Sequence, residues 1–180
     1  MIQAGCKQLA KWQKESATKE WVLAINISAK QFIQKDFLKL IGNEIQKSGI
    51  DPHYLKVELT ESLLVDDIEE IITKMKSLQA LGVRISLDDF GTGYSSLQYL
   101  KNLPLNQVKI DQSFVRNMHT NKGDIAIIQS VILLGEALSF EVIAEGVETE
   151  EHYELLKDLG CKLFQGYYFA RPQPIGMIKY

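Results

Sequence analysis

The sequence predicts an α/β fold in which parallel strands alternate with helices around an incomplete (β/α) barrel. Six short runs rich in Val, Ile and Leu are separated by amphipathic stretches, the pattern of buried parallel strands joined by helices. Polar residues stand at the C-terminal ends of these runs, and no glycine-rich phosphate turn follows the first of them. An open doubly wound sheet concentrates its ligands at one switch point, whereas a barrel gathers side chains from many strand ends, so we expect a barrel.

Each predicted strand is a short apolar run. The strands are 21–28, 55–60, 83–88, 106–111, 140–146 and 162–167. The predicted helices carry apolar residues at helical spacing, and several follow an Asp, Ser or Thr that can cap the first turn. The helices are 2–15, 30–48, 66–81, 94–101, 124–138 and 149–159. Three glycines, Gly49, Gly82 and Gly160, stand where helices should end.

The number of strands predicts that the barrel is incomplete. A full barrel of this kind has eight strands and about 250 residues, whereas this chain of 180 residues shows six strands and opens on a helix. We therefore expect an incomplete TIM-like (β/α) barrel of about six βα units, with the first two strands missing. Residues 1–180 would form a single partial domain.

The composition is that of an ordinary globular protein, with 46% hydrophobic residues, 24% charged residues and a net charge of -3. This charge argues against binding to duplex DNA or RNA, and no basic cluster indicates an anionic membrane surface. Without an apolar run of 18 residues we also expect no membrane span, and therefore no direct membrane contact. Cys6 and Cys161 lack metal-like or redox-like spacing, so we expect reduced, buried thiols in the cytoplasm. We expect only surface or structural roles for the histidines, which are His53, His119 and His152.

Acidic and amide side chains at strand ends are the candidate chemical groups. They are Asn26, Glu58, Asp88, Asp89 and Glu145. Two like charges about 4 Å apart repel by about 4 kcal/mol at an effective dielectric near 20. Carboxylates that meet at one mouth therefore need bound cations or large upward pKa shifts. Oxygen ligands without Cys or His favour a hard divalent ion, Mg²⁺ or Mn²⁺, over zinc.

The adjacent pair Asp88 and Asp89 suggests two metals. Successive residues at a strand end point to different sides, so one carboxylate can bind one ion and its neighbour a second, or bridge them. Two hard metals about 3.5–4 Å apart commonly promote the in-line attack of water on a phosphodiester.

Four further residues have both a functional and a structural interpretation. Lys109 could hold the attacking water or offset the charge of the phosphate, or it could simply pair with Asp111. Glu61 could orient the loop 91–93 by accepting its backbone N–H groups, or be an ordinary acid at a helix start. Glu148 has the same ambiguity, and Asp111 could be only a helix N-cap.

Six motifs occur in the order "NIS", "ELTES", "DDFGTGYSSL", "KIDQSF", "AEGVET" and "QGYYFARP". Together they resemble the EAL family of cyclic di-GMP phosphodiesterases, from the first helix to about Pro174. The resemblance implies a modified TIM barrel whose first strand is antiparallel to the others. It also implies Mg²⁺- or Mn²⁺-dependent hydrolysis of cyclic di-GMP to pGpG.

Carried over position by position, the resemblance implies metal ligands at Asn26, Glu58, Asp88, Asp89 and Glu145. It implies a catalytic set in which Lys109 positions the water and Glu61 steadies the "DDFGTG" loop, which in the family lies near the dimer contact. We also expect Glu148 in the catalytic set, and we expect Asp111 and Gln165 to bind the substrate.

The sequence departs from the family at its start. The Glu-Ala-Leu segment, whose glutamate is a metal ligand, and the arginine after it are absent. We therefore expect weak or no turnover by this chain. The alternatives are a catalytically inactive module that binds cyclic di-GMP or a protein, and a fragment without a role of its own. Exposed strand edges favour a homodimer, and the chain could belong to a larger, membrane-tethered protein.

Overall fold

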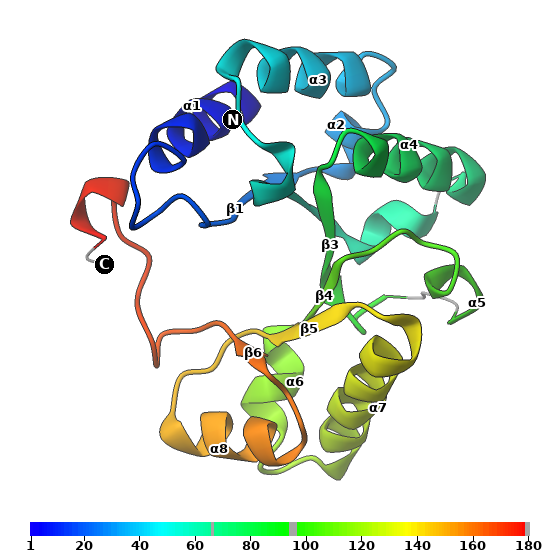
Figure 1. The fold of residues 1–180 in the computed structure, drawn as a ribbon. Helices are drawn as coiled ribbons and strands as arrows, with labels where there is room; N and C mark the ends of the chain where they lie inside the picture. Colours follow the sequence, from blue (N-terminus) through cyan, green and yellow to red (C-terminus); the bar gives the residue numbers. More distant parts are fainter. Residues whose placement is uncertain (66, 94–96, 179–180) are drawn as a thin grey trace. The chain divides into compact units, whose positions relative to one another are not determined.

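The computed structural model describes residues 1–65, 67–93 and 97–178. It has two compact units: unit 1 comprises Met1–Leu87 and Gly93–Asn106, and unit 2 comprises Asp88–Thr92 and Gln107–Tyr180. Six strands follow one another in sequence order, from β1 to β6, and helices alternate with them (Figure 1). The third strand, β3 (Arg84–Phe90), begins in unit 1 and its last three residues belong to unit 2.

Unit 1 is built on the parallel pair β1 (Leu23–Ile27) and β2 (Leu55–Thr60). Buried apolar side chains alternate with more exposed ones along both strands, so one face of the pair is buried. Asn26 lies directly opposite Glu58 in the register, on the other face. The two predicted ligands of this unit are therefore neighbours, because parallel pairing brings equivalent strand ends together.

Helices surround the strands of unit 1 in the sequence. They are α1 (Ile2–Trp12), α2 (Ala29–Phe32), α3 (Phe37–Ser48), α4 (Ile68–Ala80) and α5 (Leu97–Leu100), with short 3₁₀ turns at Pro52–Tyr54 and Glu61–Val65. Helix α1 packs against β1 and α3, and α3 also contacts α4 (Figure 1). The predicted helices 66–81 and 94–101 begin on residues outside the described parts of the chain.

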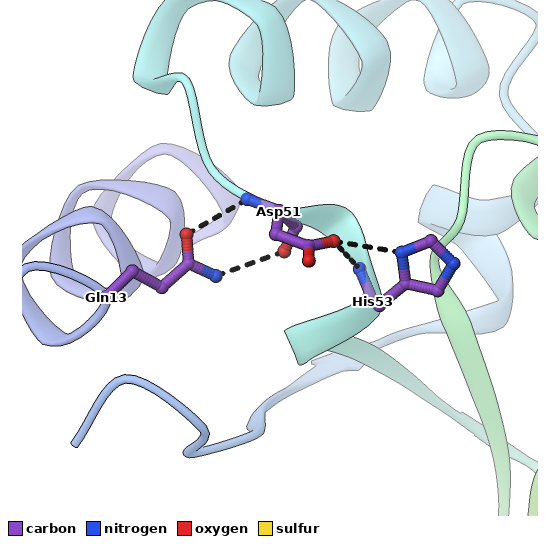
Figure 2. A network of polar contacts seen from close by, with 3 residues as sticks. All are labelled: Gln13, Asp51 and His53. Carbon is purple, nitrogen blue, oxygen red and sulfur yellow. Dashed lines mark hydrogen bonds and ion pairs between the residues drawn. The ribbon is translucent and has the colours of Figure 1, made fainter. Parts of the chain in front are cut away.

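A polar network fastens the end of α1 to the turn that precedes β2 (Figure 2). The backbone N–H of Asp51 donates to Gln13 Oε1 at 2.9 Å, and Gln13 Nε2 donates to the Asp51 carbonyl at 3.1 Å. Asp51 Oδ1 in turn accepts from the backbone N–H of His53 at 3.0 Å and lies 2.9 Å from its Nδ1. The hydrogen bond from the His53 backbone is the main cause that holds the pKa of Asp51 below its usual value, and the contact with the His53 ring is the second.

The predicted helix 30–48 is wrong as a single element, because residues 33–36 form turns between α2 and α3. Phe32 and Phe37 are both buried, and their ring centroids lie 5.4 Å apart. Five residues along a continuous helix turn the side-chain direction by about 140°, which would point the two rings to different sides. The break allows both rings to enter the same core.

Unit 2 repeats the alternation with β4 (Gln107–Ile110), β5 (Glu141–Ala144) and β6 (Leu163–Phe164), which pair in parallel. Its helices are α6 (Gln112–Asn117), α7 (Lys122–Leu138) and α8 (Glu150–Asp158), followed by a 3₁₀ turn at Ile175–Met177. Helix α7 packs against β4, β5 and α6 (Figure 1). The buried residues Val108, Ile110 and Ile128 form part of this core.

The structure confirms the predicted alternation of parallel strands and helices, with shifts at the ends. Strand β3 continues two residues beyond the predicted 83–88, and β6 is shorter than the predicted 162–167. The short helix α6 was not among the predicted helix ranges, although Asp111 before it was considered as a helix N-cap. Among the described residues, every helix is too short or too polar to cross a lipid bilayer.

Candidate functional site

Three carboxylates of unit 2 come together where its strands end. Asp88 and Asp89 are the last acidic residues of β3, and Glu145 follows β5 directly. One carboxylate oxygen from each lies within 4.8 Å of the other two. The Glu145 backbone N–H donates to the Ile110 carbonyl at 3.2 Å, which continues the β4–β5 ladder and fixes where the Glu145 side chain starts.

Lys109 of β4 lies between two of these carboxylates. Its Nζ is 2.7 Å from Glu145 Oε1 and 3.0 Å from Asp88 Oδ1. The lysine side chain is only 5% exposed, so these are buried ion pairs of the kind that water screens poorly. Lys109 thereby holds together the carboxylates of Asp88 and Glu145, which would otherwise repel each other.

The backbone at Asp89 explains how neighbouring residues reach one cluster. Successive side chains of a strand normally point to opposite faces. Asp89 has φ of 55°, in the left-handed region that aspartate tolerates better than most residues, and this turn departs from the strand alternation. Its N–H donates to Asp88 Oδ1 at 3.1 Å, and its carbonyl accepts from Thr92 Oγ1 at 2.9 Å.

A pocket of about 380 Å³ opens beside Glu145 within unit 2. Its lining residues are Gln112, Arg116, Glu145, Gly146, Glu148, Gln165, Gly166, Tyr167 and Pro172. Gly166 is required by close packing, because a Cβ there would lie 2.1 Å from the carbonyl oxygen of Val147. Gln165 follows β6, and its N–H donates to the Ala144 carbonyl at 2.8 Å, which places it next to Glu145 in the sheet.

The cluster has the chemistry of a hard-cation site. All three groups offer carboxylate oxygens, the ligands that Mg²⁺, Mn²⁺ and Ca²⁺ prefer. Among Asp88, Asp89, Glu145 and Lys109 the carboxylates outnumber the ammonium group, so these four side chains together carry excess negative charge. A divalent ion would offset it, and these residues fit such an ion.

The predicted site residues of unit 1 form a second group. Asn26 is exposed and Glu58 half-buried, on the same face of the β1–β2 pair. Glu61 is 4% exposed, and its Oε2 accepts the backbone N–H of Gly93 at 3.0 Å. This is the geometry that the loop-orienting interpretation requires. That Asn26 and Glu58 share a metal site with the cluster of unit 2 stays a prediction.

The remaining predicted residues lie around the pocket or at a helix end. Asp111 caps α6 by accepting from the backbone N–H of Ser113 at 2.9 Å. Glu148 lies 3.8 Å from Arg116, and both are substantially exposed. The sequence analysis missed Arg116 as a pocket residue. Arg116 stands five residues after Asp111, which directly follows β4, and this position near a strand end could have indicated a pocket residue.

Comparisons with known proteins give a consistent result. A protein-family profile described as "EAL domain" matches residues 1–172. Signaling protein YkoW of Bacillus subtilis is 42% identical over 174 residues, which are 97% of this chain and 22% of YkoW. MucR of Pseudomonas aeruginosa, named a bifunctional diguanylate cyclase/cyclic di-GMP phosphodiesterase, is 38% identical over 97% of this chain and 25% of its own length. The chain thus spans about a quarter or less of the length of these two relatives.

Solved structures resemble this chain closely. The PaMucR phosphodiesterase in complex with c-di-GMP matches with a TM-score of 0.92 and 38% identity, over 97% of this chain and 70% of that one. Klebsiella pneumoniae BlrP1 with manganese and cyclic di-GMP matches with a TM-score of 0.83 and 30% identity, over 95% of this chain and 44% of that one. These likenesses confirm the predicted fold class, an incomplete TIM-like (β/α) barrel.

Proposed function

This chain belongs to the EAL domain family, and we propose that its carboxylate cluster takes part in the divalent-metal-dependent hydrolysis of cyclic di-GMP to pGpG. The observation that carries the proposal is Lys109 held between Asp88 and Glu145, with Asp89 in the same cluster. A set of carboxylates around one buried lysine suits cations and phosphate better than it suits an apolar or cationic ligand.

The relatives support the substrate and the type of cofactor. PaMucR is a phosphodiesterase solved with c-di-GMP, and BlrP1 is solved with cyclic di-GMP together with manganese or with calcium. In this chain Asp88, Asp89 and Glu145 would hold the divalent ion, which we propose to be Mg²⁺ or Mn²⁺. Ions bound there would supply Lewis-acid chemistry, polarising the phosphate and lowering the pKa of water.

The protein side chains have separable tasks in this proposal. Lys109 holds the two carboxylates at 2.7 and 3.0 Å and offsets part of the negative charge that a phosphate brings. Gln165 and Arg116 in the pocket present an amide and a guanidinium group that suit polar atoms of the nucleotide. Glu61 steadies the loop that follows Asp89 through Gly93.

We also propose a homodimer that works in the cytoplasm. On α7, Leu133 is 64% exposed and Ile127 is 37% exposed, which leaves apolar side chains for a second copy to cover. Cys6 and Cys161 are buried free thiols, as a reducing compartment allows. Sedimentation of the purified chain tests the dimer, with Leu133→Asp expected to shift the population toward the monomer.

The test of the function is product formation. The purified chain is incubated with cyclic di-GMP and Mn²⁺, and pGpG is followed by chromatography. Because the Glu-Ala-Leu segment is absent, we expect at most weak product formation; any product should require Mn²⁺, disappear in Asp88→Asn and Asp89→Asn, and persist in the matched control Asp51→Asn of unit 1. Product formed by Asp88→Asn at the unsubstituted rate would contradict the proposal. Nucleotide binding without product would favour the alternative, an inactive binding module.

A further inference from the structure

His152 is buried beside the pocket and accepts a backbone hydrogen bond. It is the third residue of α8, it is 9% exposed, and its Nδ1 accepts the backbone N–H of Glu148 at 3.4 Å. The backbone N–H of His152 donates to Oγ1 of the N-cap Thr149 at 3.2 Å. This arrangement resembles a capping box, in which Glu or Gln usually takes the third position, except that the side chain of His152 accepts from the residue before the N-cap.

The hydrogen bond to His152 holds the loop 145–149, which joins β5 to α8. This loop begins with Glu145 of the carboxylate cluster and contains Glu148 of the pocket lining. On its other side, Val147 N–H donates to the Gln165 carbonyl at 3.0 Å. The loop is therefore held from β6 through Gln165 and from α8 through His152.

The donor and acceptor roles specify the form of the imidazole. The Glu148 N–H is a donor, so Nδ1 of His152 must carry a lone pair and the ring proton must lie on Nε2. In the imidazolium form both ring nitrogens are donors. Protonation would therefore set two donors against each other and break this contact.

We propose that neutral His152 is a positioning residue of the site, which holds the loop 145–149 for nucleotide binding and releases it when the imidazole is protonated. The proposal rests on the proposed function, because it takes cyclic di-GMP as the ligand whose binding changes. Nucleotide binding is then expected to weaken at acidic pH through His152, in addition to any effect of the carboxylates themselves.

The groups around His152 favour its neutral form. Burial is the main cause that lowers the pKa of His152, followed by His119, whose ring stacks on it with centroids 5.3 Å apart. Glu148 and Glu151 act in the opposite direction, and Arg116 lowers the pKa further. The ring is thus neutral at neutral pH. Stability from this group is present above the unfolded pKa, about 6.5, and is lost as the pH falls through the lower folded pKa.

Nuclear magnetic resonance tests the contact without any nucleotide. We expect the nitrogen shifts of His152 to show a proton on Nε2, and the Glu148 amide to titrate together with the ring. In His152→Gln the side-chain oxygen can still accept the amide, so that amide should no longer titrate. The control His53→Gln in unit 1 should leave the Glu148 titration unchanged. A proton on Nδ1 in neutral His152 would overturn the proposal.

Binding of fluorescent cyclic di-GMP with Ca²⁺, between about pH 5 and pH 8, tests the consequence. His152→Leu should weaken binding about five- to tenfold at neutral pH, the effect of one lost hydrogen bond. His152→Gln should bind normally there and lose affinity less than the unsubstituted chain at acidic pH. If His152→Gln and the unsubstituted chain lost the same nucleotide affinity at acidic pH, the proposed effect of His152 protonation would be refuted. If no variant binds nucleotide while the Nε2 tautomer is found, the proposed function fails and the loop contact stands.

Discussion

Replacing Lys109 by methionine removes the ammonium group between Asp88 and Glu145 while keeping a side chain of similar length. Both carboxylates are largely buried, with 14% and 15% of their side chains exposed. They would then face each other and Asp89 without that cation. We expect this substitution to destabilise unit 2 strongly, and more so when divalent ions are absent.

The distances set the size of the effect. At an effective dielectric near 20, the gross attraction is about 6 kcal/mol across the 2.7 Å pair and about 5.5 kcal/mol across the 3.0 Å pair. Desolvation of the lysine offsets much of this. Removing one partner from a buried pair typically costs about 3–5 kcal/mol, and we expect Lys109→Met to lower the free energy of unfolding of unit 2 by that amount.

Hydrogen exchange with mass spectrometry measures this loss locally. Peptides covering β4 and α6 report on unit 2, whereas fluorescence of Trp12 and Trp21 reports on unit 1 and serves as an internal control. The matched variant is Lys157→Met, which removes an exposed ion pair of α8 worth about 0–1 kcal/mol. Mn²⁺ should restore part of the loss in Lys109→Met, because a bound cation replaces the ammonium charge.

The reasoning would be refuted by a small effect. If Lys109→Met and Lys157→Met exchanged alike in the β4 peptides without metal, the buried ion pairs would contribute little. If Mn²⁺ stabilised neither the variant nor the unsubstituted chain, the cluster would not be a cation site.

Three other substitutions have defined outcomes. Glu61→Leu removes the acceptor of the Gly93 N–H and should cost unit 1 about 1–3 kcal/mol, measured by urea unfolding with tryptophan fluorescence; an unchanged midpoint would contradict it. Asp51→Ala removes the cap that accepts from His53 and should cost about 0.5–2 kcal/mol at neutral pH. Because the folded pKa of Asp51 is lowered, this deficit should shrink as the pH falls below about 4 through that pKa, and a deficit independent of pH would argue against it. Gly166→Ala places a methyl group against the Val147 backbone and should destabilise unit 2 by about 1–3 kcal/mol. Hydrogen exchange measures this loss, and unchanged exchange of the β6 peptides would contradict it.

Much of the fold follows from local patterns in the sequence. Strand β2 has the predicted bounds because Leu55, Val57 and Leu59 alternate with more polar residues and are all buried. The predicted helix ends are also found, since Gly49 and Gly160 adopt positive φ of 66° and 91° where helices stop. These features depend on neighbouring residues alone, so the sequence contains the information needed to predict them.

Other features depend on contacts that the sequence does not display. The break between α2 and α3 lets Phe32 and Phe37 meet in the core, and helical spacing alone cannot indicate it. Sequence reasoning proposed Lys109 as the cation of the site and left Asp111 as its alternative partner; the ion pairs with Asp88 and Glu145 came from the structure. For His152 the sequence predicted only a surface or structural role. Its contact is with the backbone N–H of Glu148, and a sequence pattern does not indicate such a contact.

The central claim is that carboxylates at the strand ends of unit 2 hold a divalent cation, and titration of Mn²⁺ followed by electron paramagnetic resonance tests it most directly. The unsubstituted chain should reduce the signal of free Mn²⁺, and Asp88→Asn should weaken this binding by about tenfold or more, since even outer-shell changes cost that much at metal sites. Equal Mn²⁺ affinity in the unsubstituted chain and Asp88→Asn would contradict the claim.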